Sequence, residues 1–178
     1  MFVILTLLVS TLMAAVPARP VPRTSSHLFV DSGTFEGGSP LAANIEAIRF
    51  SQNAKEKTER WVIDFSDART RTIQQIAPEF QIRIVPADKV TLGEGKEFEL
   101  SPPRLIISLS SIKANYVTAL NLNKLLKKSF LVKNIRFYPP IEDGDRAIEV
   151  TFKKSVLLEP HQPLQKEGRL VLDLKPRK

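Results

Sequence analysis

The sequence predicts a mainly β fold: a sandwich of two small related β-sheets, formed by a tandem internal repeat with one short connecting helix. Three observations lead to this expectation. Beyond Ala43, apolar residues alternate with period two, as they do in strands that bury one face. Clusters of proline, glycine and aspartate separate the alternating runs. The same order of strand motifs then occurs twice along the chain.

The first 18 residues, MFVILTLLVSTLMAAVPA, contain no charged side chain. The apolar run is shorter than the roughly 20 residues that cross a bilayer, and small residues follow it, as in a secretory signal peptide. Because no basic residue precedes the run, an uncleaved anchor is the alternative. The chain has no cysteine, which excludes lipidation at a cleavage site. We therefore expect export to the periplasm, with membrane attachment only if the leader is retained.

Residues 19–43 hold three of the seven glycines and three of the thirteen prolines. This composition is typical of a flexible linker. Apolar and aromatic residues within it, His27, Phe29 and Phe35, leave open a short partner-binding motif. We expect the folded domain to occupy residues 44–178.

Alternating runs predict the strands of this domain at residues 48–50, 59–65, 80–85, 104–109, 135–137, 147–152 and 169–174. Within one of these runs Trp61 shares a face with Ile63 and Phe65. We therefore expect Trp61 in the core and not on a sugar-binding surface.

Residues 117–129 break the alternation and fit a short helix. Its apolar side is expected to hold Val117, Leu120 and Leu125. Its solvated side is expected to hold Lys124, Lys127 and Lys128. Asn115 or Thr118 can cap its start, since both side chains accept hydrogen bonds from backbone N–H groups.

Arginines carry the repeat, because alternating apolar residues match by chance. Ile48-Arg49-Phe50 recurs as Ile135-Arg136-Phe137. The run that begins Glu59-Arg60 recurs as Asp145-Arg146, and Arg104-Leu105 recurs as Arg169-Leu170. The first copy is longer by about 21 residues, which is expected to add the strand at 80–85.

Taken in this order, the motifs resemble those of the AMIN domain, the N-terminal targeting module of bacterial N-acetylmuramoyl-L-alanine amidases. The module is also found in pilus and secretion pores. The second copy matches at residues 134–137, 145–150 and 169–176, and the first at 48–50, 60–64 and 102–107. Ser108 stands where the family has aspartate, and Gly168 replaces its proline region. The resemblance implies a sandwich of two related sheets that binds peptidoglycan and localises its carrier in the cell envelope.

Catalysis is not expected. Amidases of that family use a zinc ion held by histidines and glutamate, whereas this chain has only His27, in the linker, and His161, in an expected solvated loop. The acidic clusters Glu142-Asp143-Asp145 and Glu94-Glu97-Glu99 are expected in polar turns, where carboxylates stay solvated. We therefore expect no enzyme activity, no catalytic residue, no metal site and no cofactor.

The net charge of +7 lies wholly in residues 44–178, because Arg19 and Arg23 balance Asp31 and Glu36. No acidic residue occurs between Glu99 and Glu142. This stretch holds Arg104, Lys113, Lys124, Lys127, Lys128, Lys133 and Arg136. A solvated helix face explains several of these lysines, but an anionic polymer is also a suitable partner. No basic strand of the RNA-binding kind is present, so nucleic acid is not expected.

The candidate ligand-binding residues are the repeat arginines, Arg60, Arg104, Arg146 and Arg169. Arginine forks suit the free carboxylates of peptidoglycan stems. The alternative is that these arginines form ion pairs with Asp64 or Asp173. Tyr138, beside Pro139-Pro140, is the candidate for an exposed aromatic contact.

Together these features predict a non-catalytic exported module that binds peptidoglycan, by glycan or stem peptide, and localises itself or a partner in the periplasm. The alternative is a protein-interaction module that docks through a sheet edge onto a secretin, a pilus component or a cell-division or cell-wall hydrolase complex. A third hypothesis is an accessory subunit that recruits a separate amidase.

Overall fold

The computed structural model describes residues 19–21, 28–92, 96–140, 144–163 and 168–177, and the leader and His27 lie outside them. One short helix accompanies the strands. The elements, in chain order, are β1 (Arg19–Pro20), β2 (Gly33–Gly37), β3 (Ala43–Asn53), β4 (Thr58–Asp67), β5 (Phe80–Val85), β6 (Asp88–Leu92), β7 (Lys96–Ser101), β8 (Arg104–Leu109), β9 (Ile112–Asn115), α1 (Ala119–Leu126), β10 (Val132–Phe137), β11 (Arg146–Phe152), β12 (Val156–His161) and β13 (Arg169–Pro176).

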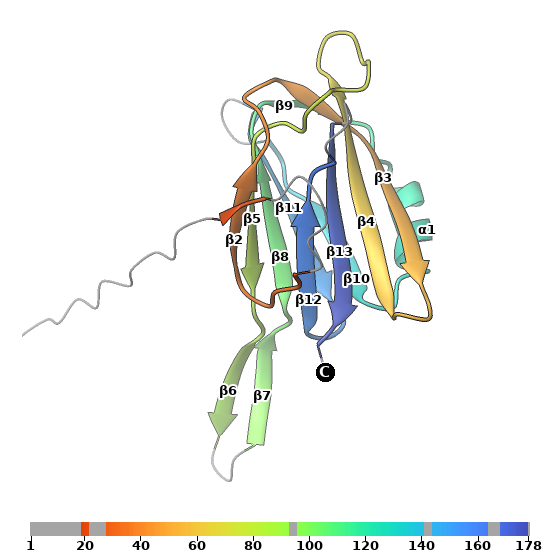
Figure 1. Cartoon of the computed structure of the whole chain (residues 1–178). Coiled ribbons are helices and arrows are strands. Elements are labelled where there is room, and N and C mark those ends of the chain that lie inside the picture. Colours follow the sequence, from red (N-terminus) through yellow and green to blue (C-terminus); the bar gives the residue numbers. More distant parts are fainter. Residues whose placement is uncertain (1–18, 22–27, 93–95, 141–143, 164–167, 178) are drawn as a thin grey trace, which may run out of the picture.

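Two sheets pack face to face, as the predicted sandwich requires (Figure 1). Sheet A has the strand order β1-β2-β5-β8-β11-β10, and sheet B has the order β12-β13-β4-β3-β9. The strands β6 and β7 pair only with each other among the described strands and project from one end of the sandwich (Figure 1). The predicted mainly β fold class is therefore confirmed.

The two repeat copies exchange their third strands. The hairpin β3–β4 comes from the first copy and the hairpin β10–β11 from the second. However, β13 of the second copy pairs with β4, and β8 of the first copy pairs with β11. Each sheet therefore combines a hairpin from one copy with a strand from the other, so neither sheet belongs to a single copy.

The strand register corrects one part of the predicted repeat. Trp61 lies opposite Phe50 and Leu172, and Ile148 lies opposite Phe137 and Ile107. These partners are themselves repeat equivalents, so Trp61 and Ile148 occupy the same position in the two sheets. Arg60 is therefore equivalent to Ala147, and the predicted match of Arg60 with Arg146 is wrong by one residue. A shift of one residue moves a side chain to the other face of its strand.

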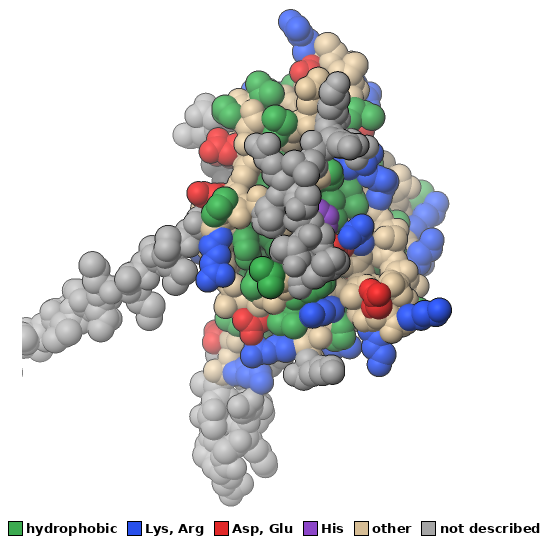
Figure 2. Space-filling model, viewed as in Figure 1, with side chains coloured by type: hydrophobic (Ala, Val, Ile, Leu, Met, Phe, Trp, Pro, Cys, Tyr) green, Lys and Arg blue, Asp and Glu red, His purple; other side chains and the backbone are tan. Residues whose placement is uncertain are grey.

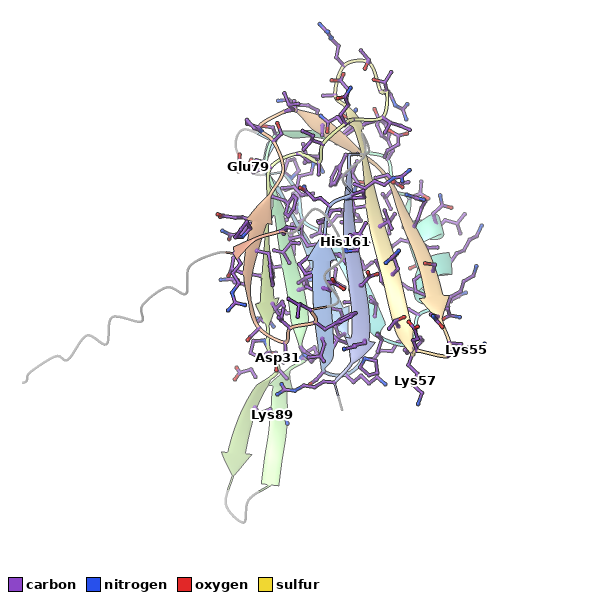
Figure 3. The ribbon with its side chains drawn as sticks, in the orientation of Figure 1. Asp31, Lys55, Lys57, Glu79, Lys89 and His161 are labelled. Atoms are coloured by element: carbon purple, nitrogen blue, oxygen red, sulfur yellow. The ribbon has the colours of Figure 1, made fainter. Side chains whose placement is uncertain are left out.

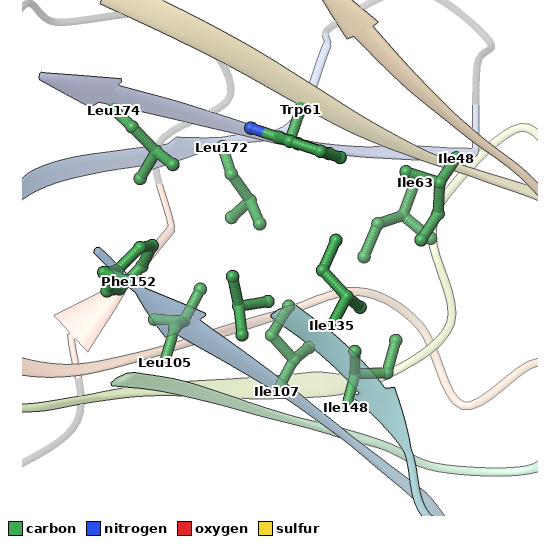
Figure 4. Close-up of a pocket in the computed structure, with 11 residues that line it drawn as sticks. Ile48, Trp61, Ile63, Leu105, Ile107, Ile135, Ile148, Phe152, Leu172 and Leu174 are labelled. Carbon is green, nitrogen blue, oxygen red and sulfur yellow. The ribbon is translucent and has the colours of Figure 1, made fainter. Parts of the chain in front are cut away.

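The core lies between the sheets, where apolar side chains from both layers meet (Figure 4). A cavity of about 20 Å³ remains there, and its lining is entirely apolar. Trp61 is 3% exposed, which confirms its predicted place in the core. Ile148, at the equivalent position of sheet A, is fully buried.

Part of the expected linker belongs to the sandwich. Strand β2 pairs with β5 in sheet A, and Phe35 packs into the core. Val30 exchanges two backbone hydrogen bonds with Leu158 of β12. The prediction of a flexible linker is therefore wrong for residues 33–37, because apolar burial and pairing outweigh their glycine-rich composition.

Helix α1 begins at the predicted cap, since the Thr118 side chain accepts a hydrogen bond from the Asn121 N–H. The helix contacts β3 of sheet B and β10 of sheet A. Leu122 is its buried residue, whereas Leu120, expected on the apolar side, is 66% exposed. Within the described ranges, no helix has the length and apolar character needed to cross a bilayer.

The buried carboxylate of Glu59 holds the connection between α1 and β10. Glu59 is 1% exposed and accepts hydrogen bonds from Trp61 Nε1 at 3.1 Å and Ser129 Oγ at 2.7 Å. It also accepts from the backbone N–H groups of Phe130 at 2.6 Å and Leu131 at 3.0 Å. The chain passes from one repeat copy to the other at this point, so a single carboxylate ties the first copy to the start of the second.

We predict that Glu59→Ala lowers the free energy of unfolding by about 3 kcal/mol, because it removes the carboxylate that accepts four hydrogen bonds, although the Leu131 N–H also donates to Ser129 Oγ at 3.2 Å. Glu59→Gln should lose less, since it keeps one acceptor oxygen. Urea denaturation measures both, with Glu56→Gln in the exposed β3–β4 turn as the control. Equal stability of Glu59→Ala and the control would contradict the role of this carboxylate.

Candidate functional site

The outer face of sheet B carries an ion cluster around Asp64. Arg49 donates from Nε to Asp64 Oδ2 at 2.5 Å and from Nη2 to Oδ1 at 2.7 Å. Arg169, the strand partner of Asp64 on β13, donates from Nε to Oδ1 at 2.9 Å. Both arginines therefore donate hydrogen bonds to the same carboxylate of the protein itself.

A second ion pair joins β4 to β13 on the same face. Arg60 donates from Nε and Nη2 to the two oxygens of Asp173, at 2.7 and 2.8 Å. This hydrogen bonding raises the pKa of Arg60 against the opposing effect of partial burial. For Arg60 and Arg169, the alternative hypothesis of internal ion pairs with Asp173 and Asp64 is confirmed.

His161 lies beside this pair and differs from its prediction (Figure 3). It ends strand β12, is 8% exposed, and has Nδ1 3.7 Å from Asp173 Oδ2. The expected solvated loop is wrong because residues 156–161 pair with β13, and an edge strand tolerates Pro160. In the part of the chain that the structure describes, no group of three or more histidine and acidic side chains could hold a metal ion.

Sheet A lacks these ion pairs at the equivalent positions. Thr151 takes the place of Asp64, and it lies opposite Arg104, the equivalent of Arg169. Arg136 takes the place of Arg49 on the neighbouring strand. These equivalences leave Arg104 and Arg136 without the carboxylate that their counterparts share.

A different acid, Glu149, lies among the outer side chains of sheet A. Tyr138 donates from its hydroxyl to Glu149 Oε2 at 2.5 Å, and Arg104 Nε lies 3.9 Å from Glu149 Oε1. The Arg136 guanidinium carbon is 6.0 Å from the centre of the Tyr138 ring. On β5, Arg83 lies in the same cross-strand row as Glu149 and Arg136. Arg104 is therefore the arginine nearest this carboxylate, and Arg136 and Arg83 lie in the same row of the sheet.

Two hollows meet on this face to form what we call the sheet A groove. One has a volume of about 700 Å³ and is lined by Arg104, Ile106, Tyr138, Pro139, Pro140, Ala147 and Glu149. The other has a volume of about 630 Å³, and its lining includes Glu36, Gly38, Pro40, Glu79, Gln81 and Ser108. They adjoin because Ser108 and Ala147 are direct partners in β8 and β11.

Two small side chains open the groove. Ser108 is equivalent to Asp173, and Ala147 is equivalent to Arg60. On sheet B this pair of positions holds a bidentate ion pair that stands on the outer face. On sheet A the same positions hold a hydroxymethyl and a methyl group. These small side chains leave the space above the strands unfilled, which forms the groove.

A close contact between two chain segments shapes the far end of the groove. Gly38 has a φ of +91°, and any Cβ there would collide with the carbonyl oxygen of Pro78. The neighbouring Ser39 N–H donates to Ala77 O at 3.0 Å. This contact brings the residue after β2 against the segment that leads into β5, and so places Glu36 and Glu79 at one end.

The predicted ligand-binding residues do not form one site. Arg104 and Tyr138 line the sheet A groove together, and Tyr138 is 39% exposed. Arg60 and Arg169 lie on sheet B. Arg146 lies opposite the core residue Leu109, and its Nε has no hydrogen-bond partner among the described residues.

Two arginines on the outer face of sheet A, Arg83 and Arg136, are not among the ligand-binding residues predicted from the sequence. The repeated Ile-Arg-Phe motif marks Arg136, and the alternation of the 80–85 run places Arg83 opposite its buried neighbours. Both signals were present in the chain. Comparison with known proteins adds nothing to them, since no protein-family model and no curated protein matches this sequence.

We predict that Asp64→Asn lowers the free energy of unfolding by about 1–2 kcal/mol, because two arginines lose their shared partner. The value is modest because the Arg49 side chain is 52% exposed and solvent screens its charge. Urea denaturation at low and high salt measures this loss, which should shrink as salt rises. Thr151→Asn, at the equivalent position of sheet A, is the control and should stay within about 0.5 kcal/mol of the wild type. Equal losses in both variants would contradict the assigned asymmetry.

Proposed function

We propose that this chain is a non-catalytic module that binds peptidoglycan through the sheet A groove and holds itself or a partner in the bacterial cell envelope. One observation carries the proposal. Arg104 and Arg136 share the outer face of sheet A with the single carboxylate of Glu149, whereas their equivalents on sheet B, Arg169 and Arg49, both donate to Asp64.

The chemistry of the groove suits an anionic polymer with apolar parts. Planar guanidinium groups bind carboxylates with two parallel hydrogen bonds. Glu149 keeps Tyr138 and Arg104 oriented, while Pro139 and Pro140 add an apolar wall. The resemblance of the repeat motifs to the AMIN domain, whose members are targeting modules, supports the same proposal.

Positive charge outside the groove would assist the approach to such a polymer. Figure 2 shows lysine and arginine side chains gathered on the side of the molecule where β3 and α1 lie. Lys124, Lys127 and Lys128 are all exposed there. Charges of this kind raise association rates and are screened by salt.

We predict that the double variant Ser108→Asp/Ala147→Arg folds normally but is retained at least about tenfold less by purified sacculi. The two side chains recreate the ion pair of sheet B and fill the floor of the groove. A sedimentation assay with sacculi measures retention, and thermal unfolding verifies the fold.

The matched control for this experiment is Arg60→Ala/Asp173→Ser, which makes the opposite exchange on sheet B. Retention of the control should match the wild type at equal folded fraction. A filled groove that binds as well as the wild type would contradict the proposed site.

We also predict that Arg104→Gln/Arg136→Gln weakens retention about a hundredfold or more, because charge-assisted hydrogen bonds contribute about 1.5–3 kcal/mol each and 1.4 kcal/mol is a factor of ten. Lys124→Gln/Lys127→Gln removes the same number of positive charges at the end of α1 and should weaken retention much less. A salt series compares the two. Absence of wild-type retention at low salt would reject peptidoglycan as the ligand.

A protein-interaction module is the second candidate function, and the projecting β6–β7 hairpin favours it. Neither strand pairs with another described strand, so each has an open edge where a partner could add a strand. Deletion of the hairpin separates the two functions, because sacculus binding through the groove should survive it while capture of an envelope protein through the strand edges should not.

A further inference from the structure

The two ends of the sheet A groove carry opposite charge. Arg104 lines the end near Tyr138, and Arg136 on β10 has its guanidinium carbon 6.0 Å from the centre of the Tyr138 ring, whereas Glu36 and Glu79 line the other end. Glu79 immediately precedes β5 (Figure 3). Both carboxylates are exposed, and neither forms an ion pair within the described ranges of the chain. In a domain with a net charge of +7, this separation of charge along one groove is a specific feature.

The floor between these ends runs straight across five strands. One cross-strand row connects Glu36, Gln81, Ser108, Ala147 and Tyr138. Four steps of about 4.8 Å separate β2 from β10, so Glu36 and Tyr138 lie on the order of 19 Å apart, while Arg104 lies on the central strand β8, four residues from Ser108. An extended peptide advances about 3.3–3.6 Å per residue, so a segment of about five or six residues has this length.

The middle of the row is neutral and able to form hydrogen bonds. Gln81 and Ser108 offer an amide and a hydroxyl that could pair with peptide N–H and C=O groups. An uncharged glycan would leave both charged ends without a partner. A chain with an ammonium group at one end and a carboxylate at the other would satisfy both.

We infer that the sheet A groove binds the peptide stems of peptidoglycan, with a stem ammonium group at Glu36 and Glu79 and a stem carboxylate at Arg104 and Arg136. The inference rests on the proposed function and names the part of the polymer that is recognised. Recognition requires both charges on one extended peptide, because the ends of the groove are too far apart for a single charged group to reach both.

Three synthetic probes test the inference with the full chain, and all have a blocked N-terminus because a stem is amide-linked to the glycan at that end. They are an alanine pentapeptide with lysine at its third position and its lysine side chain and carboxyl terminus free (the free peptide), the same peptide N-acetylated on that lysine, and the same peptide C-amidated. We expect the free peptide to compete with sacculi for the protein. Either modification should raise the concentration needed for half-maximal competition about tenfold, since each removes one charged group.

The variant Glu36→Gln/Glu79→Gln should weaken competition by the free peptide about tenfold and leave competition by the N-acetylated peptide unchanged. This pattern assigns the ammonium group to the acidic end, and a general effect on folding would not produce it. Glu56→Gln/Asp88→Asn removes the same charge outside the groove and should leave all three probes unchanged. Equal loss with the free and acetylated peptides would overturn the assignment.

Glycan strands freed of their peptides separate this inference from the proposed function. Intact sacculi should retain the protein and stripped strands should not. If both retain it equally and the pentapeptide does not compete, the stem-peptide inference is overturned while peptidoglycan binding stands. If intact sacculi fail to retain it at low salt, the proposed function itself is overturned.

Discussion

The exchange of third strands between the repeat copies is the constraint on which the structure depends. Because β13 completes the sheet of β3 and β4, and β8 completes the sheet of β10 and β11, neither copy can bury its hairpin alone. The β4–β13 pairing joins residues more than 100 positions apart, as in Arg60 with Asp173, and the β8–β11 pairing joins residues 37 to 47 positions apart. Such long-range pairing slows folding, since loop closure precedes the gain from contacts. Glu59 adds a local tie where the copies meet, which fixes the crossing of the chain from one sheet to the other.

The same exchange gives positions of β8, β10 and β11 counterparts in β13, β3 and β4, and comparing these positions reveals how the two outer faces differ. Asp64 and Thr151 share a position, as do Asp173 and Ser108, and the backbone around each pair is equivalent. One face therefore uses its arginines to join strands, while the other leaves them available along a groove. The family resemblance noted Ser108 only as a departure from an aspartate, but its place opposite Ala147 gives that departure a structural consequence.

Alternation predicted the buried strands, the extra strand β5 and the core position of Trp61, because a half-exposed strand imposes its period on the chain. It could not predict β12, because Pro160 and His161 are residue types typical of loops. Only tertiary contacts bury these residues and place them in a strand. Nor could it fix cross-strand register. A period of two lets motifs slide by one residue with little change in apolar matching, so Arg60 was aligned with Arg146. The groove depends on that register, and its acidic end lies partly in β2, within the segment whose composition favoured a linker.

Two groups of positive side chains have different roles: the lysines near α1 attract a polyanion, and the groove arginines bind it at contact. Exposed lysines on and next to α1 attract any polyanion without touching it. Salt screens this electrostatic attraction beyond about 8 Å at physiological ionic strength. The groove arginines act at contact, where Glu149 holds Arg104 and Tyr138 in a defined arrangement. Glu149 lowers the net positive charge of the groove, so it weakens nonspecific attraction while it orients the groups that bind. The opposing carboxylates of Glu36 and Glu79 extend this principle, because they penalise ligands that carry negative charge along their whole length.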